Sequence, residues 1–185
     1  MVAGIVLAAG AGTRFGGRKQ LAELDGRPLL EHALEALESA PVADRIVVLG
    51  ADADEVAAGV DLHGARAVVC EDWAEGQSAS LRTGLDAAGD AQAVVITLGD
   101  QPHIAARAIA AVIAARGDGA QAVRATYDGT ASHPTLIERE LFPALHQLTG
   151  DEGARAVLQG ARVTEVPCDG LGGPDDVDTR EQLGR

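Results

Sequence analysis

The sequence predicts an α/β fold in which helices cover both faces of a mostly parallel sheet, and three observations indicate it. Short apolar runs rich in β-branched residues alternate with amphipathic segments along the 185 residues. Apolar residues make up 46% of the chain but aromatic residues only 2%, so Ala, Val, Leu and Ile must fill the core, as is typical of helices packed closely on a parallel sheet. A glycine-rich loop follows the first apolar run, and parallel sheets bind ligands at such strand ends.

Length and composition limit the class of protein further. We expect one domain, 1–185, because the chain can bury one good core but is too short for two ordinary domains. The net charge of −13 argues against nucleic acid or an anionic membrane as the main partner. Cys70 and Cys168 show no CxxC spacing, which favours the reducing cytoplasm. We expect neither a signal peptide nor a membrane span, since residues 1–7 are too short and no run approaches eighteen apolar residues.

The first strand and its loop predict an anion-binding site. Ile5, Val6 and Leu7 suit a strand buried on both faces, and four glycines then follow within eight residues. Glycines let successive backbone N–H groups form one concavity, and Arg14, Arg18 and Lys19 add positive charge. A triphosphate is the ligand that these features suit.

Two better-known phosphate loops do not match this loop. A Walker A loop requires Gly-Lys-Ser/Thr after four intervening residues, whereas Gly17-Arg18-Lys19-Gln20 puts the lysine one place late. A dinucleotide fingerprint that starts at Gly10 meets Phe15 where its third glycine should stand. The loop therefore belongs to a different kind of phosphate site.

Lys19 is the only lysine beside fourteen arginines, and the chain has no asparagine. In a sequence this rich in arginine, a single lysine indicates a position that needs a compact, flexible point charge instead of a planar guanidinium. We expect Lys19 to bind phosphate. The alternative is a solvated surface charge.

The pattern Leu7-Ala8-Ala9-Gly10-x-Gly12-x-Arg14-x-Gly16-x-x-Lys19 resembles the opening of the MobA-like nucleotidyltransferases, which are related to molybdenum cofactor cytidylyl- and guanylyltransferases. The resemblance implies a Rossmann-like three-layer α/β/α fold of the nucleotide-diphospho-sugar-transferase type. It also implies Mg²⁺, a nucleoside triphosphate held by this loop, and transfer of the nucleotidyl group to an acceptor phosphate. Arg14 and Lys19 would be catalytic, and the implied nucleotide-binding residues in the loop are Leu7, Ala8, Ala9, Gly10, Gly12, Arg14 and Lys19.

The elements that follow continue the alternation. Gly26-Arg27-Pro28 opens a helix with one apolar face, formed by Leu29, Leu30, Ala33, Leu34 and Leu37. A strand at 45–50, a helix at 52–60 and a strand at 67–70 come next. Strands that alternate with helices in this way predict a right-handed parallel sheet.

The loop at 71–80 contains the only tryptophan and leads into a helix with Leu81 and Leu85 inward. Its polar side chains suit recognition of a base edge or ribose, although serine caps helices and glutamine is common in a solvated first turn. The segment Gly76-Gln77-Ser78-x-Ser80 resembles the cytidylyltransferase branch, which implies that Gly76, Gln77, Ser78 and Ser80 bind nucleotide.

The strand at 93–98 ends in Gly99-Asp100-Gln101-Pro102, so Asp100 should face the same crevice as the glycine loop. A carboxylate there can hold Mg²⁺ against a triphosphate. The alternative is an Asx-turn or N-cap before a helix at about 105–116. Gly99-Asp100-x-Pro102 resembles the family's metal-binding aspartate motif, which implies that Asp100 binds metal and nucleotide.

The second half of the chain predicts an antiparallel excursion, with a strand at 122–127, a turn at 128–129 and a return at 132–137. Helices at about 138–148 and up to Leu158 follow, the second with Asp151 as a plausible N-cap. His133 before a proline is more often structural than catalytic. His133, Asp151 and Arg155 resemble the same branch on its acceptor side, which implies acceptor binding.

The last strand is expected at 162–166, and a glycine-rich loop then leads to Asp175-Asp176-Val177-Asp178-Thr179. Carboxylates this close repel one another unless they are solvated or hold a cation, and a surface turn that caps the final helix is the alternative. The segment resembles the family's Asp-x-Asp-Thr element, which implies that Asp178 is a second metal ligand. The sequence departs from the family at Arg180 and Gln182, which replace a usual proline and a usual acidic residue.

The resemblance as a whole implies transfer of CMP from CTP to a phosphorylated acceptor, a molybdopterin-type cofactor, with release of pyrophosphate. Ala9 favours CTP, because guanylyl-transferring relatives tend to have glycine there. The alternatives are guanylyl transfer from GTP, cytidylyl transfer to a sugar or polyol phosphate, or a carrier without chemistry that delivers cofactor to a molybdenum hydroxylase. A redox role is not expected, since no nicotinamide or flavin fingerprint is present.

Overall fold

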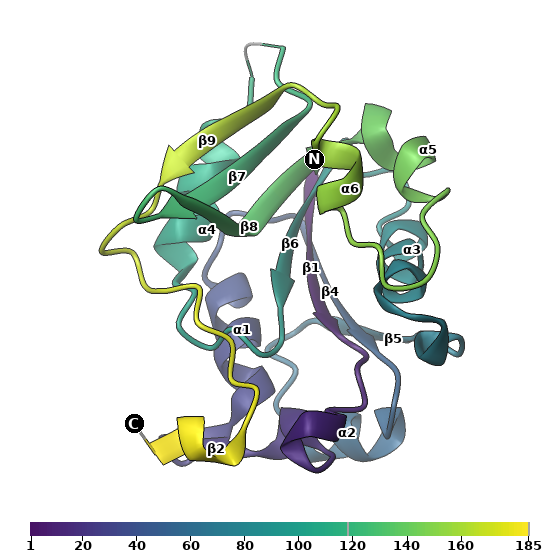
Figure 1. Cartoon of the computed structure of the whole chain (residues 1–185), viewed down its shortest axis with the longest axis vertical. Helices are drawn as coiled ribbons and strands as arrows, with labels where there is room; N and C mark the ends of the chain where they lie inside the picture. Colours follow the sequence, from purple (N-terminus) through teal and green to yellow (C-terminus); the bar gives the residue numbers. More distant parts are fainter. Residues whose placement is uncertain (118, 185) are drawn as a thin grey trace.

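The computed structural model describes residues 1–117 and 119–184. A seven-stranded sheet has the strand order β5-β4-β1-β6-β8-β7-β9 (Figure 1). Its strands are β1 (Val2–Ala8), β4 (Asp44–Leu49), β5 (Arg66–Val69), β6 (Ala93–Leu98), β7 (Ala122–Tyr127), β8 (Thr130–Glu138) and β9 (Val163–Pro167). Within the described residues β8 runs antiparallel to both neighbours and the other pairs are parallel, which confirms the predicted excursion.

Helices cover both faces of this sheet (Figure 1). One face packs against α1 (Leu29–Glu38) and α4 (Ala106–Ala114), and the other against α3 (Gln77–Ala87) and α5 (Phe142–Leu145). Val6 and Ile5 of β1 point to opposite cores, as strand geometry requires. This arrangement confirms the Rossmann-like three-layer α/β/α fold. The remaining α-helices are α2 (Ala53–Gly59) and α6 (Arg155–Leu158).

The sequence-based prediction of the first helix is confirmed, because all five residues of its predicted apolar face are buried. The small antiparallel hairpin before that helix was not predicted. It joins β2 (Glu23–Leu24) to β3 (Arg27–Pro28), and Asp25 in its turn has a φ of 53°. Two residues a strand carry too little pattern to be recognised in a sequence.

The predicted helix at 138–148 is wrong in length. Glu138 ends β8, because its N–H donates to the carbonyl of Gln121 and its carboxylate binds Arg116. A 3₁₀ turn, Arg139–Leu141, then precedes a short α5. Asp151 is not an N-cap either. The helix α6 starts after Ala154, and no side chain caps it. The carbonyl of Gly150, next to Asp151, accepts a hydrogen bond from the N–H of Ser78 at 3.1 Å.

The chain after β9 returns to the carboxyl ends of the strands (Figure 1). The N–H of Gly173 donates to the carbonyl of His103, and that of Val177 to the carbonyl of Asp100 at 2.9 Å. A 3₁₀ turn, Arg180–Gly184, follows where the sequence predicted a final helix. Within residues 1–117 and 119–184, no helix combines the length and the apolar character that crossing a membrane requires.

Candidate active site

The candidate site forms where β1 and β6 end side by side. Leu7 pairs with Leu98 in the sheet, and the N–H of Gly99 donates to the carbonyl of Leu7 at 2.9 Å. A Cβ atom on Gly99 would lie 2.9 Å from the Cβ of Ala8, so the two loops could not approach this closely with a side chain there. Asp100 is thereby placed beside the glycine loop.

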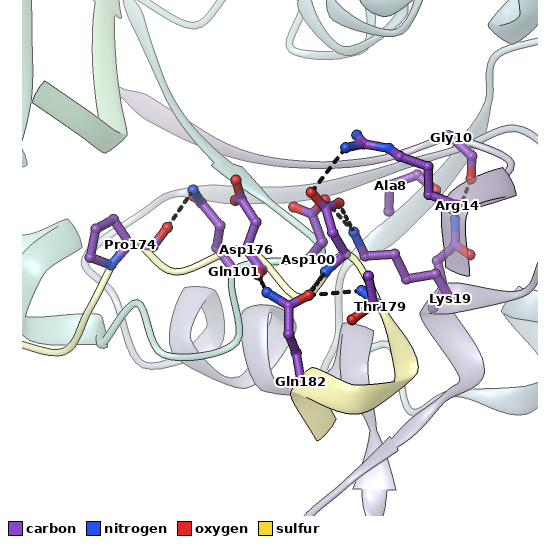
Figure 2. Close-up of polar contacts among 12 residues, drawn as sticks. Ala8, Gly10, Arg14, Lys19, Asp100, Gln101, Pro174, Asp176, Thr179 and Gln182 are labelled. Atoms are coloured by element: carbon purple, nitrogen blue, oxygen red, sulfur yellow. Dashed lines mark hydrogen bonds and ion pairs between the residues drawn. The ribbon is translucent and has the colours of Figure 1, made fainter. Parts of the chain in front are cut away.

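Lys19 connects the loop to two distant carboxylates (Figure 2). Its Nζ donates to Oδ2 of Asp100 at 2.9 Å and to Oδ1 of Asp178 at 3.0 Å. The Lys19 side chain is only 11% exposed, so the amine lies inside the site. Arg14 adds a weaker ion pair, 3.3 Å from Asp178, and its side chain is largely exposed. The structure thus brings together four charged residues that were predicted from the start, the middle and the end of the sequence.

The loop itself consists of two 3₁₀ turns, Thr13–Phe15 and Lys19–Leu21. The carbonyl of Gly12 accepts hydrogen bonds from the N–H groups of Phe15 and Gly17, at 2.9 and 3.0 Å. Gly12 has a φ of 59°, and a Cβ atom there would lie 2.9 Å from the Cβ of Lys19. Glycine at position 12 therefore allows Lys19 to pack directly on the loop.

Gln20 shapes this loop and was missed by the sequence analysis. Its Nε2 donates to the carbonyls of Ala8 and Gly10, at 2.7 and 2.9 Å, and the residue is 7% exposed. Holding these two oxygens removes groups that would repel an anion. The only available signal was a polar amide directly after the predicted phosphate-binding lysine.

The segment that supplies Asp178 is held on both sides. Val177 is buried with Phe15, Leu24 and Leu29 in a small apolar cluster. Oε1 of Gln182 accepts hydrogen bonds from the N–H groups of Asp178 and Thr179, at 2.6 and 2.7 Å (Figure 2). Gln182 therefore does what the usual acidic residue at this place could do, because either side chain offers an acceptor oxygen.

The electrostatics keep Asp178 ionised. The hydrogen bond from Lys19, and then the charges of Lys19 and Arg14, hold the pKa of Asp178 below its ordinary value. Asp176 behaves in the opposite way, since burial and the charges of Asp100 and Asp178 raise its pKa. Of these two carboxylates, Asp178 is therefore the one whose environment favours a negative charge.

Two adjoining cavities follow the loop. One of about 240 Å³ is lined by Ala8, Gly12, Arg14, Lys19 and Asp178 among others. The second, of about 420 Å³, is lined by residues of the loop, of the segment that leads into α3, of α3 itself and of the segment before α6: Ala9, Trp73, Gly76, Gln77, Ser80 and Asp151. Both include Leu7, Gly10 and Asp100. All the predicted nucleotide-binding residues except Ser78 line one cavity or the other. Ser78 is fully buried, and its hydroxyl has no partner among the described residues.

A third cavity, of about 340 Å³, holds two of the three predicted acceptor-binding residues. His133 and Arg155 line it together with Arg124, Ser132 and Gln77. Burial lowers the pKa of His133 to about 4, although the charge of Asp100 acts in the opposite direction. His133 is therefore neutral near pH 7. Asp151 lies apart from this pair, in the cavity beside Gly76.

Asp100 and Asp178 provide the ligand type that a hard divalent cation prefers. Both contact the same ammonium group, so their carboxylates converge on one point. The second oxygen of Asp100 has no hydrogen-bonding partner in the described part of the chain. Two carboxylates fit a metal that takes its remaining ligands from phosphate and water, whereas no group of three or more His, Cys, Asp or Glu side chains suited to a metal occurs among the described residues.

A mostly parallel α/β sheet that carries a glycine-rich loop at a strand end, beside two carboxylates that share one lysine, suits a protein that handles phosphorylated nucleotides. The chain belongs to the MobA-like NTP transferase domain family, whose profile matches residues 4–166. Asp178 lies beyond the matched residues.

The chain is also similar to individual proteins and solved structures. The chain is 34% identical to nicotine blue oxidoreductase of Paenarthrobacter nicotinovorans, over 100% of this chain and 95% of that protein. The crystal structure of Rv0371c from Mycobacterium tuberculosis aligns with a TM-score of 0.89 at 33% identity, over 100% and 95% of the two chains. Rv0371c has also been solved with manganese (TM-score 0.85, 32% identity, 100% and 96% coverage). A 2-C-methyl-D-erythritol 4-phosphate cytidylyltransferase of Rubrobacter xylanophilus is 33% identical over 58% of this chain and 49% of its own length.

Proposed function

We propose that this protein transfers CMP from CTP to a phosphorylated acceptor of the molybdopterin type, with Mg²⁺, and releases pyrophosphate. The observation that carries the proposal is the position of Lys19, whose amine lies at the wall of the glycine loop and contacts both Asp100 and Asp178. A structural salt bridge alone would not require a glycine-rich loop on one side of the lysine.

The reaction forms one bond and breaks one. An oxygen of the acceptor phosphate attacks the α-phosphorus of CTP, and the bond from that phosphorus to the oxygen bridging it to the β-phosphate breaks. An acceptor phosphate is already ionised near neutral pH, so no general base is needed. Positioning and charge neutralisation supply the rate.

Different residues of the site contribute to the positioning and to the charge neutralisation. Lys19 and Arg14 neutralise the triphosphate, while Gln20 keeps the loop carbonyls away from it. Asp100 and Asp178 would hold the metal, which supplies positive charge near the α-phosphorus and the leaving pyrophosphate. The fit of two carboxylates, and the manganese in the related Rv0371c structure, support this assignment.

The second cavity suits the base and ribose. Gln77 and Ser80 offer polar groups, and the small side chain of Ala9 allows close approach to the backbone. Ala9 in place of glycine favours CTP over GTP, and the similarity to a cytidylyltransferase supports the same choice.

The third cavity suits the acceptor. Arg155 makes no ion pair with any described residue, so its charge is available for a phosphate. His133 lines the same cavity as a neutral imidazole that can donate or accept a hydrogen bond. A molybdenum hydroxylase is the recipient that such a product would have.

A dinucleotide-dependent redox function has less support, despite the name of one relative. The residue at the third glycine position of a dinucleotide fingerprint is Phe15, which is 4% exposed and packs in the small cluster around Val177. The loop also leads into 3₁₀ turns instead of the long helix whose N-terminus binds a pyrophosphate.

The test is pyrophosphate release from CTP, GTP, ATP and UTP, each with Mg²⁺ and molybdopterin, and from CTP with sugar or polyol phosphates. Release with CTP and molybdopterin is expected, and Asp178→Asn should lower it by about 100-fold or more. Tight cofactor binding without release from any triphosphate would instead establish a carrier.

A further inference from the structure

Lys19 places its ammonium group at a position where one cation is shared by Asp100 and Asp178. Its amine contacts one oxygen of each carboxylate and is more deeply buried than either. The two carboxylate side chains are 34% and 36% exposed, against 11% for the lysine. The carboxylates are therefore open to solvent ions, while the position between them is filled by the protein's own ammonium group.

The backbone of Lys19 belongs to the glycine-loop side of the site, opposite the two carboxylates that its amine contacts. Its Cβ packs against Gly12 in the glycine loop, and its own turn is held by the N–H of Ala22, which donates to the Lys19 carbonyl at 3.1 Å. Four methylene groups separate this anchored backbone from the amine. Rotation about those bonds can direct the amine toward the carboxylates or toward a phosphate on the loop without moving the backbone.

The charges make these two positions of the amine respond to ligands. A divalent ion held by the same two carboxylates would be repelled by an ammonium group between them. A triphosphate on the loop offers the ammonium group a more highly charged anion than either carboxylate. Binding of a triphosphate therefore frees the carboxylates, and by linkage a bound metal strengthens triphosphate binding by the same factor.

We propose that the ammonium group of Lys19 occupies the metal site in the absence of nucleotide and yields it to a divalent ion only when a triphosphate binds. This inference rests on the proposed function, since it assumes that Asp100 and Asp178 hold the metal and that the loop holds the triphosphate. The metal then enters together with, or after, the nucleotide.

The first experiment measures Mn²⁺ binding without nucleotide, by the loss of the electron paramagnetic resonance signal of free Mn²⁺. Lys19→Met should bind Mn²⁺ at least about tenfold more tightly than the wild type, because the competing cation is gone. Arg27→Met is the control. It removes a positive charge that pairs with Glu35 at 2.8 Å and is not part of the glycine loop, and it should leave the Mn²⁺ affinity unchanged.

The same measurement on Asp178→Asn separates the inference from the function on which it rests. If this variant binds Mn²⁺, with a non-hydrolysable CTP analogue present, as well as the wild type does, the proposed metal site is wrong and the inference falls with it. If Asp178→Asn loses the metal but Lys19→Met binds it no more tightly than the wild type, only the inference is overturned.

The wild-type protein provides a second measurement that does not depend on how a variant folds. Lys19 is the only lysine, so incorporation of lysine labelled with ¹³C at Cε gives a single side-chain signal. The CTP analogue should move this signal, and Mg²⁺ alone at the same concentration should not. If Mg²⁺ alone moves the signal to the position that it takes with both ligands, the inference is overturned.

Discussion

The buried amide of Gln20 and the amine of Lys19 are neighbours in the sequence but act on different groups. Gln20 holds two backbone carbonyls of the loop, whereas Lys19 crosses to two carboxylates. Lys19, Asp100 and Asp178 were predicted as site residues because each stands in a recognisable pattern of residue types. Gln20 was not, because only the loop's folded geometry shows which carbonyls need a partner.

His133 should make folding stability depend on pH. Its pKa is about 4 in the folded protein against 6.5 as the ordinary value, so between these values the unfolded chain binds a proton that the folded protein does not. Stability therefore falls as the pH drops from 6.5 toward 4. From pH 7 to pH 5 we expect a loss of up to about 2 kcal/mol from this residue.

Urea unfolding of the wild type and of His133→Asn at pH 7 and pH 5 checks this prediction. The variant should lose less stability on acidification than the wild type, and the other titrating groups cancel in the comparison. Equal losses in the two proteins would show that His133 does not titrate with a lowered pKa.

The C-terminal 3₁₀ turn, Arg180–Gly184, orients the side chain of Gln182 toward the backbone of Asp178. Gln182→Ala removes the acceptor of the Asp178 and Thr179 N–H groups, so Asp178 should be held less firmly at the site. We expect pyrophosphate release to fall by about tenfold and stability by about 1 kcal/mol. Gln182→Glu keeps the acceptor oxygen and should restore most of the activity. Equal activity in all three proteins would show that this turn does not position Asp178.

The two ends of α3 differ in how closely another segment approaches. Gly76 at its start has a φ of 113°, and a Cβ atom there would lie 2.4 Å from the carbonyl carbon and oxygen of Gly150. Gly89, just beyond its end, has a φ of 55° and nothing within 4 Å of such an atom. Gly89→Ala should cost about 1 kcal/mol from backbone strain alone, and Gly76→Ala clearly more, because the loop must also move. Urea denaturation compares the two variants, and an equal cost would contradict the close contact.

Short elements were the ones that the sequence analysis misjudged. The buried strands β1 and β6 are continuous apolar runs and the helix α1 has a regular amphipathic pattern, so their positions were predicted well. The helix α5 has four residues, and each strand of the β2–β3 hairpin has two. Tertiary contacts decide such pieces. The hydrogen bond between Glu138 and Gln121 extends β8 to the residue at which a helix was expected to start.

Across the whole molecule, three cavities at the carboxyl ends of the strands divide the predicted site residues. Sequence similarity grouped His133, Asp151 and Arg155, but the fold separates Asp151 from the other two. A sequence pattern indicates which residues lie near a site. Gln77 lines both cavities, and only the packing of α3 against the loop at 150–153 shows which of the two cavities each acceptor-side residue lines.

The fluorescence of Trp73, the only tryptophan, can show which of these cavities a ligand occupies. Trp73 lines the cavity assigned to the base and ribose, so nucleotide binding should change its fluorescence. With Mg²⁺ present, we expect CTP to saturate the signal at a concentration at least about tenfold lower than GTP does. Inorganic triphosphate should compete with CTP while changing the fluorescence much less, because it fills only the cavity lined by Lys19. An equal change with triphosphate alone would place the base elsewhere.

The ion pair between Lys19 and Asp178 joins positions that are 159 residues apart. During synthesis on the ribosome, the glycine loop therefore emerges early and waits for almost the whole chain before its second carboxylate arrives. Until then the lysine has at most one of the two acidic partners that it contacts in the folded protein. In the proposed transferase, the second carboxylate of the metal site is therefore synthesised only after the residues that line the third cavity, the last of which is Leu158.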